Sequence, residues 1–158
     1  MAAYGRSERW TADGGYATPA EWLAKLAEVI GPELGEPADA PAAARFVFAD
    51  DVVVSAVMDG VLGQPHAASA LQEFARRLRG LERTEPAQVT ALFKALRADL
   101  KERDGLRGRE VMMTIRAALT GRVEGPCLEI VVCLLGRRRT LERLLTWDME
   151  AQDDAAGL

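Results

Sequence analysis

The chain has 158 residues, of which 49% are hydrophobic and 28% are charged, and its formal net charge is −4. This composition lies within the globular range and leaves room for one domain. The longest uninterrupted apolar run, Ile130 to Leu135, is far below the ~20 residues that a bilayer span requires, and residues 1–20 contain no secretory leader, so we expect a soluble, cytoplasmic protein without membrane contact.

The first predicted helix begins at a capping box. Thr18-Pro19-Ala20-Glu21 places a threonine cap before a proline at the first helical position and a glutamate two residues later. Apolar residues then recur at intervals of three and four from Trp22 to Ile30, and Gly31-Pro32 ends the pattern. The preceding residues 1–17 hold three glycines and no apolar period, so we expect them to be a flexible lead-in.

The apolar segments Phe46–Phe48 and Val52–Val54 have an ambiguous pattern. Short apolar runs fit either a strand or a buried helix. Pro37 and Pro41 leave only a short alanine-rich turn ahead of the first of these two segments, and the patterns on both sides of the segments are helical. We therefore favour helix over strand here.

Five further helices follow from apolar spacing, from proline near helix starts and from glycine after helix ends. Short joints connect them, which is typical of an all-α bundle. Residues 18–147 are expected to form one helical domain with a first part over 18–80 and a second over 81–147, followed by an acidic tail at 148–158. The predicted helices span 65–80, 85–104, 109–119, 126–135 and 138–147.

Charge is distributed unevenly along the chain. Residues 1–75 carry 4 basic and 11 acidic side chains, residues 76–143 carry 16 basic and 9 acidic, and residues 144–158 carry 4 acidic and none basic. The negative total argues against nucleic-acid binding, but the local field of a basic middle segment can still attract a polyanion.

Residues that catalyse reactions or hold metals form no recognisable site. Cys127 and Cys133 lie about 120° apart on a helix, so we predict neither a disulfide nor a shared metal site and expect both to be small core residues. For His66, the single histidine, a surface position is favoured over a catalytic base, and for Asp50-Asp51 a solvated turn is favoured. Phosphate-loop, nucleophile-elbow and zinc-protease motifs do not occur, so we predict no catalytic residue, no cofactor and no metal.

Arg116 lies at the edge of a predicted apolar helix face, four residues after Met112 and three before Leu119. Arg109, seven residues earlier, lies on nearly the same line. A guanidinium at this position needs an internal carboxylate or an external anion, because an unpaired buried charge is strongly destabilising. Both alternatives stay open; the candidate internal partners are Glu110, Glu124 and Glu129.

The joint over residues 120–126 brings the end of one predicted helix close to the start of the next. Thr120 closes the first helix, Gly125 and Pro126 precede the second, and Arg122 lies between them. The unpaired N–H groups of a helix start, beside a cation, can receive a phosphate or a base edge. The joint can equally be a tight corner without a ligand.

Arg137, Arg138 and Arg139 follow Gly136 directly. If a helix begins here, three cations crowd its positive end, and an anionic partner would stabilise them. If they instead complete the preceding helix, its C-terminus favours cations. The sequence leaves both possibilities open.

Motifs in this region occur in the order and spacing of a known family. They are Thr114-Ile-Arg-Ala-Ala-Leu-Thr-Gly121, Gly125-Pro126-x-Leu128, and Leu134-Leu-Gly-Arg-Arg-Arg139 followed by Leu141-x-Arg143-Leu144. With these motifs the sequence resembles the C-terminal anticodon-binding region of bacterial glutamyl-tRNA synthetases over roughly residues 20–146. The segment Arg45-Phe-Val-Phe-Ala-Asp-Asp51 also resembles the family's aromatic-acidic segment.

The resemblance implies an all-α helical cage of the class I synthetase type that holds the anticodon of a glutamate-type tRNA. In the family, the groups that meet anticodon bases correspond to Arg116 and to the helix start at 125–128. Combined with the basic residues described above, the expected RNA-binding set is Arg109, Arg116, Thr120, Arg122, Gly125, Pro126, Leu128, Arg137, Arg138 and Arg139.

Two features of the family are missing from this sequence. The H-I-G-H and K-M-S-K-S-type signatures of the catalytic half do not occur, so we expect no enzymatic activity from this chain alone. Between Lys25 and Arg45 there is no basic residue, although the family has an arginine there that takes part in anticodon discrimination. We therefore expect a free-standing tRNA-binding module that serves a separate catalytic partner. The alternative is a protein–protein adaptor that kept the fold and lost RNA binding.

Overall fold

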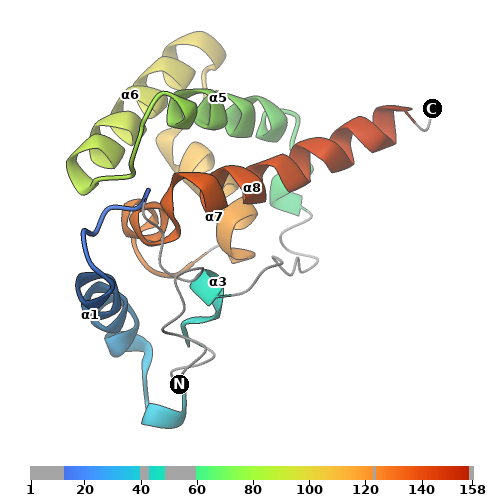
Figure 1. Cartoon of the computed structure of the whole chain (residues 1–158). Coiled ribbons are helices and arrows are strands. Elements are labelled where there is room, and N and C mark those ends of the chain that lie inside the picture. The colour runs from blue at the N-terminus through green and yellow to red at the C-terminus, as the bar shows by residue number, and fades with distance from the viewer. Residues whose placement is uncertain (1–12, 40–42, 49–59, 123, 157–158) are drawn as a thin grey trace.

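The computed structural model of the chain describes residues 13–39, 43–48, 60–122 and 124–156. Every named element in these ranges is helical, which confirms the all-α expectation. The longer helices gather into one body, and the N-terminal helix lies beneath it beside a short helical turn (Figure 1). In chain order the elements are α1 (Pro19–Ile30), the 3-10 turns η2 (Gly31–Glu33) and η3 (Pro37–Asp39), α3 (Arg45–Phe48), α5 (Ala67–Arg79), α6 (Pro86–Asp104), α7 (Gly108–Thr120) and α8 (Leu128–Ala156).

Local sequence signals set most of the helix ends. The hydroxyl of Thr18 accepts a hydrogen bond from the Glu21 N–H, as the capping box predicts, at 3.2 Å. Helices α6 and α7 end on Gly105 and Gly121, whose φ angles of 69° and 72° are left-handed. The helical expectation for 46–48 is confirmed by α3, whereas 52–54 lies outside the described residues.

Helix α8 contains the two helices that the sequence predicts on either side of Gly136. Gly136 has a φ of 81° and a ψ of 169°, so the backbone is not helical there and α8 consists of two segments. The second segment continues to Ala156 rather than ending at Trp147. The part of the predicted acidic tail over residues 148–156 continues this helical segment, and these residues include good helix formers and neither glycine nor proline.

The segment before α1, together with Trp22 of α1, forms hydrogen bonds to the residues around this break in α8. The Gly15 N–H donates to the Cys133 carbonyl at 3.0 Å, and the Trp22 indole N–H donates to the Leu134 carbonyl at 2.7 Å. The Arg138 N–H donates to the Asp13 carboxylate at 2.6 Å. Residues 13–17 fall within the predicted flexible lead-in, and there Asp13 and Gly15 provide hydrogen bonds that the interrupted helix lacks.

The core lies between α5, α6, α7 and the first segment of α8, with α1 added through Trp22, which is 1% exposed. Phe74 of α5 stacks on Phe93 of α6 with ring centroids 5.1 Å apart. Cys133 is buried, as expected, but Cys127 is exposed because it precedes the first turn of α8. Burial therefore separates the two cysteines, and only one is a core residue.

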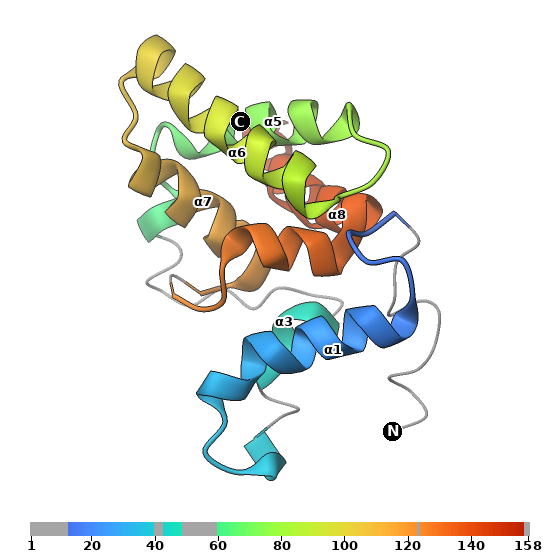
Figure 2. The same ribbon diagram turned by 90° about the vertical axis from the view of Figure 1, so that its left-hand side faces the viewer.

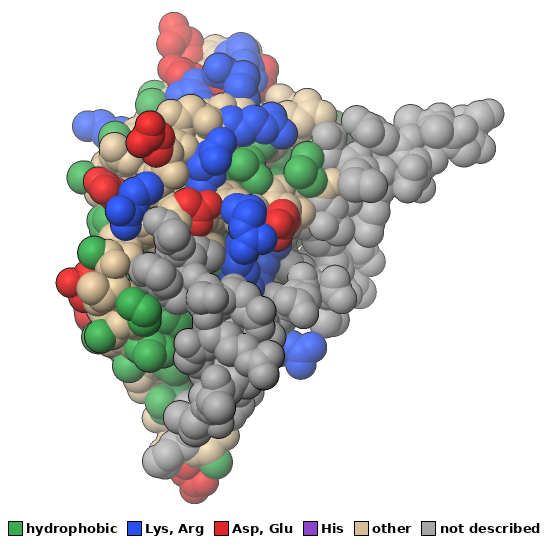
Figure 3. Space-filling view, viewed as in Figure 1, with side chains coloured by type: hydrophobic (Ala, Val, Ile, Leu, Met, Phe, Trp, Pro, Cys, Tyr) green, Lys and Arg blue, Asp and Glu red, His purple; other side chains and the backbone are tan. Residues whose placement is uncertain are grey.

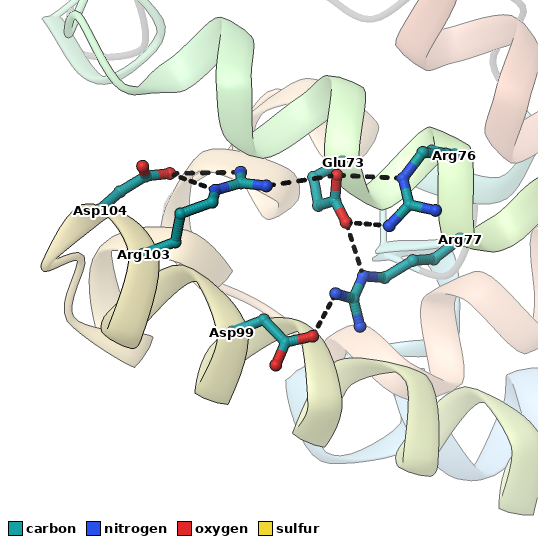
Figure 4. A network of polar contacts seen from close by, with 6 residues as sticks. All are labelled: Glu73, Arg76, Arg77, Asp99, Arg103 and Asp104. Carbon is teal, nitrogen blue, oxygen red and sulfur yellow. Dashed lines mark hydrogen bonds and ion pairs between the residues drawn. The ribbon is translucent and has the colours of Figure 1, made fainter.

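A polar network joins α5 to α6 (Figure 4). The Glu73 carboxylate accepts hydrogen bonds from Arg76 Nε at 3.2 Å and from Arg77 Nε at 3.0 Å. Arg77 also pairs with Asp99 on α6, and Arg103 Nη1 of α6 lies 3.9 Å from Glu73. The hydrogen bond from Arg76 is the largest cause that lowers the pKa of Glu73 from 4.5 to about 2.

We expect Trp22→Phe to lower the free energy of unfolding by about 1–3 kcal/mol, because it leaves the buried Leu134 carbonyl without its donor. Urea unfolding of both proteins measures the difference. The control is Leu23→Ala on the same helix, where the side chain is 44% exposed. We expect a loss below about 0.5 kcal/mol for this control. Equal losses in the two variants would contradict the role of the indole hydrogen bond.

The Glu73 network predicts a defined acid sensitivity. Because the folded-state pKa of Glu73 is depressed, its ionised form contributes fully to stability above pH 4.5, and the contribution is lost as the pH falls towards about 2. We expect Glu73→Gln to be less stable than the wild type at pH 7, and the difference to shrink across this pH range. Unfolding curves at several pH values measure it. A stability difference that stays constant from pH 7 to pH 2 would contradict the prediction.

Candidate nucleic-acid interface

In the connection from α7 to α8, the described residues 121–122 and 124–127 form a corner, which we call the α7–α8 corner. Figure 2 shows it as an open loop at the edge of the fold. Gly121 turns the chain out of α7, and Gly125 has a φ of 148°, which side chains rarely adopt. A Cβ atom built on Gly125 would lie 3.7 Å from Arg116 Nη1. Glycine here thus lets the backbone turn beside a guanidinium.

Arg116 points from α7 into this corner and is half-buried. Its Nη1 donates to the Pro126 carbonyl, so one donor fixes the loop. No described carboxylate pairs with Arg116, and its other donors have no hydrogen-bond partner among the described residues. Burial is the main cause that lowers the pKa of Arg116, and the neighbouring Arg122 lowers it further. Glu110, Glu124 and Glu129, which the sequence offers as internal partners, do not neutralise it.

Thr120 holds the last turn of α7 against the corner. Its hydroxyl donates to the Arg116 carbonyl at 2.8 Å and accepts from the Arg122 N–H at 3.2 Å. The Thr120 side chain therefore connects the backbone of Arg116 to the backbone of Arg122. Thr120 is half-buried, so its role here is to shape the loop.

Arg109 and Arg122 are exposed, and neither side chain has a bonded partner among the described residues. Arg109 lies in the first turn of α7, seven residues from Arg116, which corresponds to about 10 Å along the helix. Gly125 is exposed and Pro126 is half-buried at the same corner. The structure thus brings together Arg116, Thr120, Arg122, Gly125 and Pro126, with Arg109 further along the helix.

Leu128 is a predicted contact residue whose side chain lies inside the protein. Its side chain is 1% exposed and belongs to the hydrophobic core. Leucine at the first position of α8 is buried against the bundle, so its side chain supports the helix start.

The three arginines after Gly136 do not form one cluster. The Arg138 N–H donates to Asp13 and its side chain pairs with Glu142 at 3.1 Å, so an internal anion meets the start of the new helical segment. Arg137 Nη2 donates to the Arg79 carbonyl at 3.5 Å. Arg139 is 8% exposed and donates to the Val47 carbonyl, so its guanidinium is bonded inside the protein.

Arg143 is a buried arginine that the sequence indicated only as part of a family motif. It is 6% exposed, and its Nη1 donates to the Phe46 carbonyl at 2.5 Å and to the Leu119 carbonyl at 2.6 Å. The sequence signal that could have found it is spacing: Arg139 and Arg143 are four residues apart and share one face of a helix. The contact partners themselves are too distant in sequence to infer.

Charged side chains of both signs are mixed on the face shown in Figure 3. Lys and Arg alternate with Asp and Glu over the upper half, where Figure 1 places α5 and α6, and hydrophobic side chains gather at the lower left over α1. The basic excess of residues 76–143 is therefore not one continuous positive patch on this face.

The described ranges also bear on metal binding and on membrane crossing. In these ranges, no three His, Cys, Asp or Glu side chains come together in a way that could hold a metal ion. Within the same part of the chain, no helix has the length and apolarity needed to cross a membrane.

These features define an all-helical domain with a basic corner between two of its helices. Residues 6–147 match the family model described as an anticodon binding domain, so the chain belongs to the anticodon-binding domain family. The resemblance to glutamyl-tRNA synthetases that the sequence motifs suggest is confirmed by this match and by the similar proteins below.

The chain is similar to glutamate–tRNA ligase 2 of Nitrosococcus oceani, with 33% identity over 138 residues that cover 87% of this chain and 27% of that protein. It is 28% identical to the glutamate–tRNA ligase of Listeria monocytogenes over 80% of this chain and 26% of that protein. A 52-residue stretch is 52% identical to glutamate–tRNA ligase 1 of Halorhodospira halophila, covering 33% of this chain and 11% of that protein. The chain therefore spans about a quarter of the first two curated relatives.

A solved structure confirms the fold. The crystal structure of a glutamate tRNA ligase from Elizabethkingia meningosepticum in complex with its amino acid is similar with a TM-score of 0.71 over 82% of this chain and 25% of that chain. The sequence identity is 19%, so this similarity supports the architecture alone.

We expect Thr120→Val to lower the free energy of unfolding by about 0.5–1.5 kcal/mol, because valine has the same shape but removes the hydroxyl that bridges Arg116 and Arg122. Thr120→Ser keeps the hydroxyl and should recover most of the loss. Chemical denaturation of the three proteins measures this order. If valine and serine destabilise equally, the hydroxyl does not hold the corner.

Proposed function

We propose that the domain binds the anticodon arm of a glutamate-type tRNA through the α7–α8 corner. It would present this RNA to a catalytic unit that carries the ATP-binding signatures absent from these 158 residues. The family assignment and the similarity to glutamate–tRNA ligases support this proposal. Such a role implies a cytoplasmic protein.

The observation that carries the proposal is the state of Arg116. One of its donors shapes the loop through Pro126, while the others have no partner among the described residues. A half-buried guanidinium loses part of its hydration, so an external acceptor is favourable there. RNA bases offer such acceptors on their exposed edges when a loop is single-stranded.

Two exposed arginines extend this surface to the RNA backbone. Arg122 lies beside Arg116, and Arg109 lies about two helical turns away, a separation comparable to one or two phosphate spacings. Glu110 and Glu124 reduce the net charge of the region, so we expect binding that is moderate in strength and sensitive to salt.

Charge reversal tests this assignment. We expect Arg122→Glu to weaken binding of a fluorescent glutamate-type anticodon stem–loop about 10-fold at low salt, because an attractive contact becomes repulsive. Arg116→Gln should weaken binding by a similar factor through the loss of a base contact. Fluorescence anisotropy titrations measure both affinities.

The matched control is Lys94→Glu, which makes the same charge change at an exposed position of α6, a helix that supplies no residue of the corner. We expect a change of less than about twofold for it. Equal and negligible affinity of the wild type for this stem–loop and for an unrelated hairpin would refute the proposed function. A protein that copurifies with the domain in a ribonuclease-resistant manner, without RNA, would instead support the adaptor alternative.

A further inference from the structure

Arg143 lies at a junction of three chain segments that are far apart in sequence. It belongs to the second segment of α8, after the break at Gly136. Its Nη1 donates to the Phe46 carbonyl of α3 at 2.5 Å and to the Leu119 carbonyl of α7 at 2.6 Å. Leu119 immediately precedes Thr120, whose hydroxyl shapes the α7–α8 corner.

The contact with Leu119 places a cation at the end of a helix. The last carbonyls of a helix lack intrahelical partners and carry partial negative charge, so a guanidinium stabilises them. Arg143 is 6% exposed, and it therefore acts on this helix end from inside the protein. Its Nη1 bonds a carbonyl of α7 and a carbonyl of α3 at the same time, which fixes α7 relative to α3.

Arg139 makes a parallel contact one turn earlier on the same helical segment. Its Nη2 donates to the Val47 carbonyl, next to the carbonyl that Arg143 holds. The two arginines together attach the second segment of α8 to α3, and Arg143 also bonds this segment to the last turn of α7. Arg143 therefore connects the second segment of α8 to the residue that precedes Thr120.

We propose that Arg143 is a positioning residue for RNA recognition, which sets the end of α7 and thereby the placement of Arg116 and Arg122. The inference rests on the function proposed above. Arg143 does not touch RNA; it acts through the Leu119 carbonyl and the turn that follows. Removing it should loosen the corner without removing a phosphate contact.

Salt dependence separates these two roles. A variant that loses a phosphate contact has a salt slope, log affinity against log salt, that is shallower by about 0.7 for a single-stranded RNA site. A variant that only misplaces the contacts loses affinity at an unchanged slope. We expect Arg143→Met to bind the anticodon stem–loop about 10-fold more weakly at the wild-type slope. Arg122→Gln, in contrast, should reduce the slope.

Arg143→Lys is the conservative variant. A lysine ammonium can still donate to a backbone carbonyl but lacks the planar fork of arginine, so we expect it to restore part of the affinity. Because Arg143→Met could fail to fold, amide hydrogen exchange is also measured in Arg143→Lys. We expect faster exchange at Gly121 and Arg122 than in the wild type.

Glu73→Gln is the stability control, because it destabilises the α5–α6 network and has no described contact with the α7–α8 corner. It should bind the stem–loop as the wild type does. If Arg143→Met binds the stem–loop with the affinity of the wild type, or if the salt slope of this variant is shallower by about 0.7, the positioning role is overturned. Failure of the wild type to bind any stem–loop would refute the proposed function, and unchanged amide exchange in Arg143→Lys would independently refute the positioning role.

Discussion

The interruption of α8 at Gly136 is the constraint on which the rest of the structure depends. A helix that stops and restarts leaves carbonyls at its end and N–H groups at its new start without helical partners. Here the Cys133 and Leu134 carbonyls and the Arg138 N–H all find partners in residues 13–22. Because unpaired buried backbone groups are costly, the change of direction in α8 and the docking of the N-terminal segment require each other.

The same interruption determines what the following arginines can do. After Gly136 the chain runs in a new direction, and Arg139 and Arg143 lie on one face of the second helical segment. That face meets the carbonyls of α3 and the end of α7. The three arginines that look like an RNA-binding stretch in the sequence are therefore divided: Arg139 bonds inside the fold, and the exposed Arg138 pairs with Glu142.

Local features of the sequence predicted much of the fold. The Thr18 cap, the glycines at 121 and 136, and the periodic apolar residues identify helices whose ends mostly agree within two residues, since these signals act within one turn of the chain. Arg116 was also identified from the sequence as a candidate site residue, because its position on the helical wheel conflicts with an apolar face. Periodicity alone thus locates residues that violate it.

The remaining features depend on partners that lie far away in sequence. Asp13 caps a helical segment that begins more than a hundred residues later, with a sequence separation of 125. Arg139 and Leu128 are buried by other parts of the protein, and no local sequence pattern reveals this burial. Family motifs mark such positions without distinguishing a ligand contact from an internal one, so the division of the arginines needed the structure.

The tie between the two ends of the domain also has a consequence for the order of folding. Trp22 and Leu134 are 112 residues apart, and their hydrogen bond forms only when both segments are present. Helices α5, α6 and α7 can pair with near neighbours, whereas α1 must wait for a partner made late in synthesis. During translation, the indole N–H of Trp22 therefore stays without its buried acceptor until Leu134 has been made, so α1 completes its docking after the helices between them can pair.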